Sequence, residues 1–471
     1  MPHPGWLSIL PPVLAIVLAI WTKQVYLSLF FGIWFGWTIL AHGNPIIGLR
    51  DALECCVNVF KDSGNTKVVA FSALVGALIA FTQHSGGVSG FVDWISRRGF
   101  ITNRRRAGLL AWSLGVIIFV ESSITALVTG AVCRPIFDKL KISREKLAYF
   151  CDSTSAPVCI LIPLNAWGAY IIGLLASQGY SNPLSTMVAA MPLNFYAILA
   201  LFFTLYIAYT GNDFGPMARA EKRARELGQV LRPGAEPLVS KELTELQAKE
   251  GVPRRARNFL IPIAVMVIMM PVGLYITGNG NLTQGSGSTS VFWAVLTATT
   301  VGAVMYMAQK IFNLHETTEL FFKGFGGLMP LALLMMFAFA IGQTTGELET
   351  GKYVAGLANK FLNPNLVPAV LFLIACFIAF STGTSWGTFA IMIPIAVPMA
   401  KMLGTNDILA IAAVLGGGIF GDHCSPISDT TIISSMASAS DHIDHVNTQM
   451  PYALAVAGVS VILYAVFGFI L

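Results

Sequence analysis

The chain has 471 residues, of which 55% are hydrophobic and 11% are charged, and its net charge is +5. Soluble domains carry about 25% charged residues, so this composition excludes an ordinary soluble enzyme or binding module. The basic residues lie in short segments between apolar stretches, which is typical of membrane topology and not of a nucleic-acid-binding surface. The seven cysteines follow no disulfide or metal-ligand spacing, and no cofactor is expected.

Apolar stretches that can cross a bilayer recur along the chain, and residues 6–21 lack the basic start of a secretory signal. We expect helices at 7–21, 24–41, 66–83, 107–119, 122–138, 145–176, 185–210, 258–276, 289–313, 323–345, 366–380, 386–400, 406–440 and 450–471. The pairs 107–119/122–138 and 366–380/386–400 predict re-entrant hairpins. Segments 145–176 and 406–440 predict helices broken beside Pro157 and Pro426, because proline removes a backbone donor.

The two halves of the chain match one another weakly but in order. Residues 80–86 align with 340–346, 119–123 with 380–384, and 150–155 with 420–425. The expected fold is an all-α polytopic membrane protein with two inverted repeats, each of five transmembrane helices, one broken, plus a re-entrant helical hairpin. Residues 1–210 and 258–471 are the predicted repeats.

Residues 211–257 are the predicted basic cytoplasmic linker, and a charged helix on the membrane surface is the alternative for its start. The positive-inside rule places this linker and the other basic loops in the cytoplasm. Both termini are then expected outside the cytoplasm.

The tips of the two predicted hairpins differ in chemistry. Glu121 in the first tip is costly inside a membrane unless it is paired, hydrated or bound to a cation. It therefore predicts a Na+ or proton ligand, and a surface ion pair with Arg134 is the alternative. The second tip has no acid, and packing between helices is its alternative role. The further oxygen ligands expected from the tips are Ser122, Ser123, Thr382, Gly383, Thr384 and Ser385.

The broken helices carry the other acids. Asp422 and Asp429 interrupt an apolar run beside Pro426, and Asp152 precedes Pro157. Burial raises a carboxyl pKa and a bound cation lowers it, so these acids predict sites that exchange a proton for Na+. A helix-capping role is the alternative for Asp152. The hydroxyls expected to support them are those of Thr154 and Ser425.

Three further residues are candidates for binding an organic substrate, namely Asn165, His423 and Trp386. A neutral histidine satisfied in the interior is the alternative for His423. Residues 441–445 contain two Asp and two His, whose spacing suits a metal or a pH sensor. A solvated helix end at the cytoplasmic edge is the preferred interpretation of that cluster.

Residues 421–431 (GDHCSPISDTT) and 445–453 (HVNTQMPYA) resemble the signature of the NhaC family of Na+/H+ antiporters. The organisation of nearly the whole chain is similar to that family and to the wider ion transporter superfamily. The resemblance implies a scaffold domain, a mobile transport domain of hairpins and broken helices, a homodimer and elevator-like motion.

We therefore expect a secondary active transporter that exchanges Na+ for H+ across the cytoplasmic (inner) membrane. The alternative is a Na+- or H+-coupled carrier of an amino acid or small organic acid. An enzyme is not expected, because the partial Gly-x-Gly-Asp motif of intramembrane proteases has Ile419 in place of its first glycine.

Overall fold

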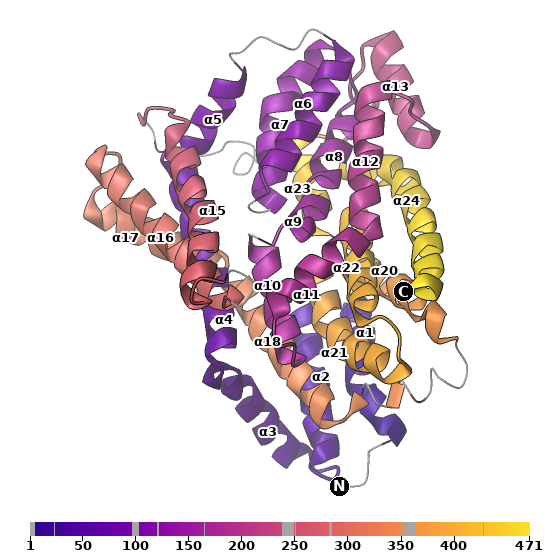
Figure 1. The fold of residues 1–471 in the computed structure, drawn as a ribbon. Coiled ribbons are helices and arrows are strands. Elements are labelled where there is room, and N and C mark those ends of the chain that lie inside the picture. Colours follow the sequence, from indigo (N-terminus) through magenta and orange to yellow (C-terminus); the bar gives the residue numbers. More distant parts are fainter. Residues whose placement is uncertain are drawn as a thin grey trace.

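The computed structural model describes residues 5–22, 24–96, 103–119, 122–163, 165–237, 249, 251–281, 285–350, 353–354, 356, 363–426 and 428–471. These residues form helices and turns, together with one isolated β-bridge between Pro237 and Asp441 (Figure 1). Eight of the described helical stretches are long and apolar enough to cross a membrane. The predicted polytopic all-α fold is confirmed.

The helices of the first half include several that are too short to cross a bilayer. They are η1 (Gly5–Ile9), α1 (Leu10–Thr22), α2 (Val25–Leu40), α3 (Pro45–Asn58), η2 (Val59–Lys61), α4 (Ser63–His84), α5 (Gly87–Ser96), α6 (Arg104–Ile117), α7 (Ser122–Lys139), α8 (Arg144–Ser153), α9 (Ala156–Leu161), α10 (Ala166–Ser177), α11 (Pro183–Ala190), η3 (Met191–Leu193), α12 (Phe195–Thr210) and α13 (Gly215–Leu227).

The second half repeats the order of helices, hairpin and broken helix. Its elements are α15 (Arg257–Thr277), α16 (Gly287–Ala308), α17 (Leu314–Gly327), α18 (Met329–Glu347), η5 (Pro364–Leu366), α20 (Val367–Thr382), α21 (Ser385–Leu403), α22 (Asp407–Cys424), α23 (Asp429–Ser438) and α24 (His442–Ile470). The inverted relation of the two halves stays a prediction.

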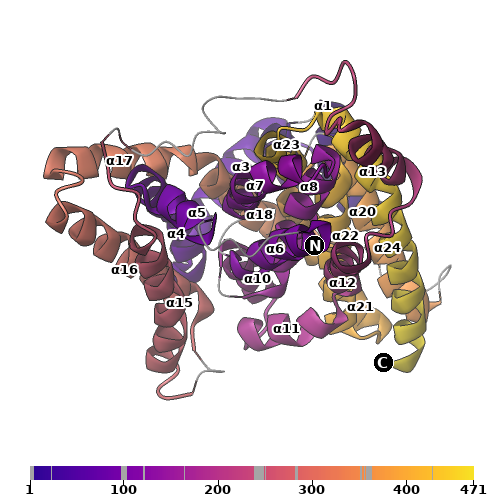
Figure 2. The same cartoon turned by 90° about the horizontal axis from the view of Figure 1, so that it is seen from above.

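The helices gather into two groups, which both views show side by side (Figures 1 and 2). The outer group consists of α4, α5, α15, α16 and α17. The site group consists of α6 to α9, α12 and α20 to α24. Helix α10 packs against members of both groups, and α18 packs against α4 and α21.

Both predicted helix breaks are present. Helix α8 ends at Ser153 and α9 begins at Ala156, while α22 ends at Cys424 and α23 begins at Asp429. The turn of the second hairpin contains Gly383 at φ 70°, a left-handed conformation that glycine adopts without strain. Thr384 then caps α21 by accepting a hydrogen bond from the N–H of Gly387.

Several predicted boundaries were wrong. Helices α3 and α5 were not predicted, and the predicted helix 323–345 lies in two helices that meet at Leu328. Helix α24 begins at His442, eight residues before the predicted start, because Asp441 caps it through the N–H groups of Ile443 and Asp444. At the start of the predicted linker, residues 215–227 form helix α13, and its position on a membrane surface stays a prediction.

Helix α22 packs closely on the hairpin helix α20 because glycines face it. A Cβ atom on Gly417 would lie 2.5 Å from the carbonyl oxygen of Phe372, and one on Gly421 would lie 2.3 Å from the N atom of Phe380. Small residues permit such close helix contacts in membranes. The glycine-rich run 416–421 thus allows the broken helix α22 to pack directly against helix α20 of the second hairpin.

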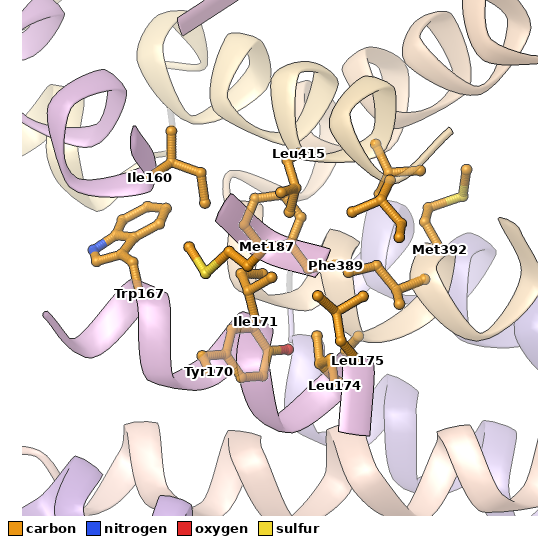
Figure 3. Close-up of a cluster of buried hydrophobic side chains, with 14 of the residues drawn as sticks. Ile160, Trp167, Tyr170, Ile171, Leu174, Leu175, Met187, Phe389, Met392 and Leu415 are labelled. Atoms are coloured by element: carbon orange, nitrogen blue, oxygen red, sulfur yellow. The ribbon is translucent and has the colours of Figure 1, made fainter. Parts of the chain in front are cut away.

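Large apolar side chains fill the space where α9, α10, α11, α21 and α22 meet (Figure 3). Trp167 and Tyr170 of α10 lie there beside Phe389 of α21, and all three are buried. This packing fixes α10 and the second hairpin against the broken helix α22.

The linker helix α13 is held on the site group by buried ion pairs. Lys146 Nζ of α8 lies 2.7 Å from Asp213 Oδ2 and 3.7 Å from Glu221 Oε2. Arg104 of α6 also pairs with Glu221, and Arg223 Nη2 of α13 lies 2.8 Å from Glu145 Oε1. The far end of the linker contacts the outer group instead.

At that far end, Lys249 Nζ lies 2.6 Å from Glu316 Oε1 of α17. The backbone N–H of Lys249 donates a hydrogen bond to the carbonyl oxygen of His84 in α4. Before this point, the N–H of Glu236 donates to Asp441 Oδ2 beside α24. Glu236 and Lys249 of the linker therefore contact different helix groups.

Candidate functional site

Asp422 lies in the last turn of α22, where the broken helix meets the second hairpin. Its side chain is 1% exposed. The hydroxyl of Ser385 at the hairpin tip donates to Oδ2 at 2.7 Å, and the hydroxyl of Ser428 beyond the break donates to Oδ1 at 2.7 Å. Thr430 Oγ1 lies 3.0 Å from Ser428 Oγ. A buried carboxylate and three hydroxyl oxygens thus gather at one point.

The main chain of the hairpin tip is joined to the same break. Ser425 donates its hydroxyl to the carbonyl oxygen of Phe380 at 2.7 Å. Thr430 and Thr431 donate to the carbonyl oxygen of Asp422. These bonds satisfy carbonyl groups at the ends of α20 and α22, which is necessary where the backbone is irregular at membrane depth.

Asp152 aligns with Asp422 in the predicted repeat but has different partners. Gln449 Nε2 of α24 donates to its Oδ2 at 2.8 Å, and His445 Nε2 lies 3.2 Å from the same oxygen. Asp152 and His445 are both fully buried. Asp152 Oδ1, His445 Nδ1 and Gln449 Oε1 have no hydrogen-bond partner among the described residues. The capping role considered for Asp152 is therefore wrong.

The placement of His445 corrects a second prediction. The sequence favoured a solvated helix end for residues 441–445, but His445, the fourth residue of α24, points toward Asp152. His442 is also engaged, since its ring nitrogens lie 2.7 Å from the carbonyl oxygen of Pro426 and 3.0 Å from Ser435 Oγ. Only Ile443 in this segment is mostly exposed.

His423 joins the two broken helices. Its Nε2 lies 2.7 Å from Ser153 Oγ, and its Nδ1 lies 2.8 Å from the hydroxyl of Tyr196 in α12. Gln449 also donates to its carbonyl oxygen. Both ring nitrogens are therefore satisfied inside the protein, in agreement with the alternative interpretation of this residue. Ser153 and His423 are equivalent positions in the alignment of the halves.

The first hairpin tip lies partly outside the described residues. Glu121 is outside them, as are the side chains of Ser123 and Asp429, and Ser122 is buried at the start of α7. Asn165 caps α10 and donates to the carbonyl oxygen of Phe119 before the tip, at 2.9 Å. Asn165 therefore supports the hairpin backbone in the described structure.

The remaining predicted residues contribute to local structure. Thr154 and Thr382 donate to carbonyl groups one turn earlier in their own helices. The ring of Trp386 packs on those of Trp167 and Tyr170, with centroids 4.7 and 4.9 Å away. Tyr170 also donates to the carbonyl oxygen of Trp386 at 2.8 Å.

Sequence reasoning missed Ser428, His445 and Gln449. Ser428 lies between Pro426 and the acid at 429, so its place in the break was a usable signal. His445 and Gln449 are four residues apart and therefore share one face of a helix. That spacing indicates a common partner, although it does not identify Asp152 as the partner.

A model of the Na+/H+ antiporter family matches residues 158–469. An uncharacterized protein of Haemophilus influenzae is 34% identical over 486 residues, which cover 98% of this chain and 91% of that protein. The crystal structure of the Alcanivorax borkumensis YdaH transporter is similar to this structure, with a TM-score of 0.63 at 16% sequence identity over 99% of both chains. At this identity, the similarity concerns the fold alone.

Two antiporters match over shorter regions. The malate-2H(+)/Na(+)-lactate antiporter of Bacillus subtilis is 31% identical over 110 residues, 23% of this chain and 24% of that protein. The arginine/ornithine antiporter ArcD of Halobacterium salinarum is 26% identical over 211 residues, 44% of this chain and 41% of that protein. With the family model matching more than half of its length, this chain is a multi-pass secondary transporter and belongs to the Na+/H+ antiporter family.

Proposed function

We propose that the protein exchanges Na+ for H+ and that Asp422 is the carboxylate at which the two ions compete. The observation that carries this proposal is the arrangement of Ser385 and Ser428, whose hydroxyls meet the two oxygens of the buried Asp422 carboxylate at 2.7 Å. Oxygen atoms are the ligands that hard cations prefer. Na+ would be held by Asp422, Ser385 and Ser428.

The chemistry of exchange follows from burial. An isolated carboxylate at this depth is costly, so it is stabilised either by a cation or by a proton. Na+ lowers the proton affinity of the carboxyl group, and protonation removes the charge that attracts Na+. Because one carboxyl group serves both ions, loading with one ion excludes the other, which is the requirement for antiport.

We further propose that the site group moves against the outer group as an elevator. A cavity of about 490 Å³ lies between the groups, lined by residues of α4, α10, α18 and α21. Asp62 and Glu347 are among its acidic lining residues, and such a wall favours cations. The bonds of Ser385 and Ser425 tie the hairpin to the broken helix, so these elements would move together. A homodimer stays a prediction.

The decisive test is Na+-driven proton movement in liposomes containing Asp422→Asn, read with a pH-sensitive dye after a sodium jump. We expect no exchange, because the amide neither carries the charge nor takes up the proton. Asp407→Asn is the matched control, since Asp407 lies at the opposite end of α22, where it accepts a hydrogen bond from Tyr180. Exchange by the Asp422→Asn protein at the normal rate would remove Asp422 from the mechanism.

Asp429, Glu121 and Asp152 stay predicted participants. Asp429→Asn in the same assay is expected to abolish exchange, as the placement of this acid directly after the break predicts. Asp152 has a free buried oxygen, Oδ1, which suits a second proton or cation position. Exchange that is normal in the Asp429→Asn protein would exclude a direct role for that carboxylate.

A second candidate function is coupled transport of an amino acid or small organic acid. The motivating observations are the matched relatives, which are named as lactate/malate and arginine/ornithine antiporters. Trp386, which is only partly buried and packs on Trp167 and Tyr170, lies at the second hairpin tip, where an organic molecule would contact it. Counterflow of labelled amino acids and carboxylic acids tests this function, and its absence for all of them would exclude those classes.

A further inference from the structure

A cavity of about 530 Å³ lies between α6, α8, α12 and α13. Helices α6 and α13 lie near the top of the molecule in the view of Figure 1. The cavity is separate from the site of Asp422. Four basic residues and one acidic residue, Glu221, are among those that line it, and the basic ones are Arg104, Arg105, Lys146 and Arg225.

The positive charge in this cavity is only partly balanced. Lys146 and Arg104 pair with Glu221, and Lys146 also pairs with Asp213. Arg105 and Arg225 are exposed and form no ion pair in the part of the chain that the structure describes. Two guanidinium groups that have no carboxylate partner of their own therefore line one cavity, and their positive charge favours a bound anion.

Arg105 is held in position by an aromatic ring. Its Cζ atom lies 3.3 Å from the centroid of Tyr209 in α12, which is a close cation–π contact. A guanidinium stacked in this way keeps its N–H edges available for hydrogen bonds. Two planar N–H edges match the geometry of a phosphate group better than that of a monoatomic anion.

The surroundings of the cavity suit a lipid. Phe202, Tyr206 and Tyr209 of α12 are 65%, 48% and 54% exposed on the outer face of that helix. Tyrosine is enriched where a membrane protein passes from hydrocarbon to head groups. The cavity wall also includes Phe137 and Ile142, so a phosphate bound here would have apolar surface beside it for the start of an acyl chain.

We propose that this cavity binds the phosphate group of an anionic phospholipid, in the leaflet that adjoins the basic linker. Basic pockets between membrane helices on the cytoplasmic side are suited to such head groups. The lipid would join α6 and α12 to the linker helix α13 through Arg105 and Arg225. This inference is independent of the ions exchanged at Asp422.

The test is native mass spectrometry of the detergent-purified full-length chain, titrated with phosphatidylglycerol or with phosphatidylcholine of the same acyl chains. A third titration uses inorganic phosphate. The variant is Arg105→Gln/Arg225→Gln. The matched control is Arg219→Gln/Lys222→Gln, which removes two exposed charges from α13 outside the cavity lining.

Wild type and control are expected to bind phosphatidylglycerol more tightly than phosphatidylcholine. The double variant is expected to bind phosphatidylglycerol about 30-fold more weakly, the factor for losing two charges near an anionic head group. Arg105→Lys/Arg225→Lys, which keeps both charges, should recover part of the affinity and guards against misfolding.

Three results would overturn the proposal. The first is equal affinity of the wild-type chain for the two lipids, which requires no variant. The second is equal affinity of the double variant and the control for phosphatidylglycerol. The third is saturation by inorganic phosphate that phosphatidylglycerol does not displace, which would assign the cavity to a soluble anion.

Discussion

The hydroxyl of Ser385, at the tip of the second hairpin, donates a hydrogen bond to the Asp422 carboxylate at 2.7 Å. In Ser385→Ala the carboxylate loses this donor, and Na+ at the proposed site would lose one oxygen ligand. A hydrogen bond to a charged group contributes about 1.5–3 kcal/mol net. We therefore expect the half-saturating Na+ concentration to rise by about 10- to 150-fold.

The assay is the Na+ dependence of antiport in proteoliposomes, with thermal unfolding measured on the same preparations. Thr388→Ala is the matched control, because Thr388 is buried one turn further along α21 and donates its hydroxyl to the carbonyl oxygen of Thr384 instead. The control should keep the wild-type Na+ affinity. An unchanged half-saturating Na+ concentration in folded Ser385→Ala protein would refute the reasoning, as would an equal loss in the control.

Three other substitutions test the described contacts. Gln449→Leu removes the amide that donates to Asp152, and unfolding should become easier by about 1–3 kcal/mol, measured by thermal melting. Lys146→Met leaves Asp213 buried without its cation and should cost about 3–5 kcal/mol, whereas adding Asp213→Asn should restore part of the loss. Asp441→Ala removes a helix cap worth about 1 kcal/mol and should speed proteolysis in the linker.

The pH dependence of the Asp441 contact has a definite sign. Partial burial raises the pKa of Asp441, but backbone N–H groups and Arg232 outweigh it, so the pKa lies below its ordinary value. A depressed pKa stabilises the folded state above the ordinary pKa, and that contribution disappears as the pH falls through the depressed pKa. Linker proteolysis should therefore be constant at neutral pH and increase only in acid.

For each of the three substitutions, one outcome would contradict the contact that it tests. For Gln449→Leu, the control is Asn447→Ala, an exposed residue on the same helix whose loss should change the unfolding free energy by about 0.5 kcal/mol or less. Equal melting of the two proteins would show that the amide does not stabilise the core. Unchanged stability of Lys146→Met, or unchanged linker cleavage in Asp441→Ala, would contradict the corresponding contact.

The sequence predicted the breaks because their cause is local. Proline at 157 and 426 removes a donor wherever the helix lies, so both interruptions follow from the residues alone. Asp422 was found for a similar reason, since an acid in an apolar run beside a break requires partners. These features depend on the chain within one helical turn.

The partners of the acids depend on tertiary packing and were mostly missed. His445 belongs to a polar cluster whose composition suggests solvent, and only the packing of α24 on α8 buries it against Asp152. The two aspartates that the predicted repeat aligns therefore have unequal surroundings, hydroxyl groups at Asp422 and an imidazole with an amide at Asp152. No repeat alignment conveys that difference, because the partners lie outside the matched segments.

The attachment of the linker to both helix groups sets a mechanical limit. Pro237 is bridged to Asp441 beside α24, and Lys249 is fixed to Glu316 of α17, with twelve residue steps between them. An extended chain advances at most about 3.6 Å per step, so the tether reaches about 43 Å. If the site group moves past the outer group as proposed, its stroke would end when this tether is taut, unless an anchor at either end detaches first.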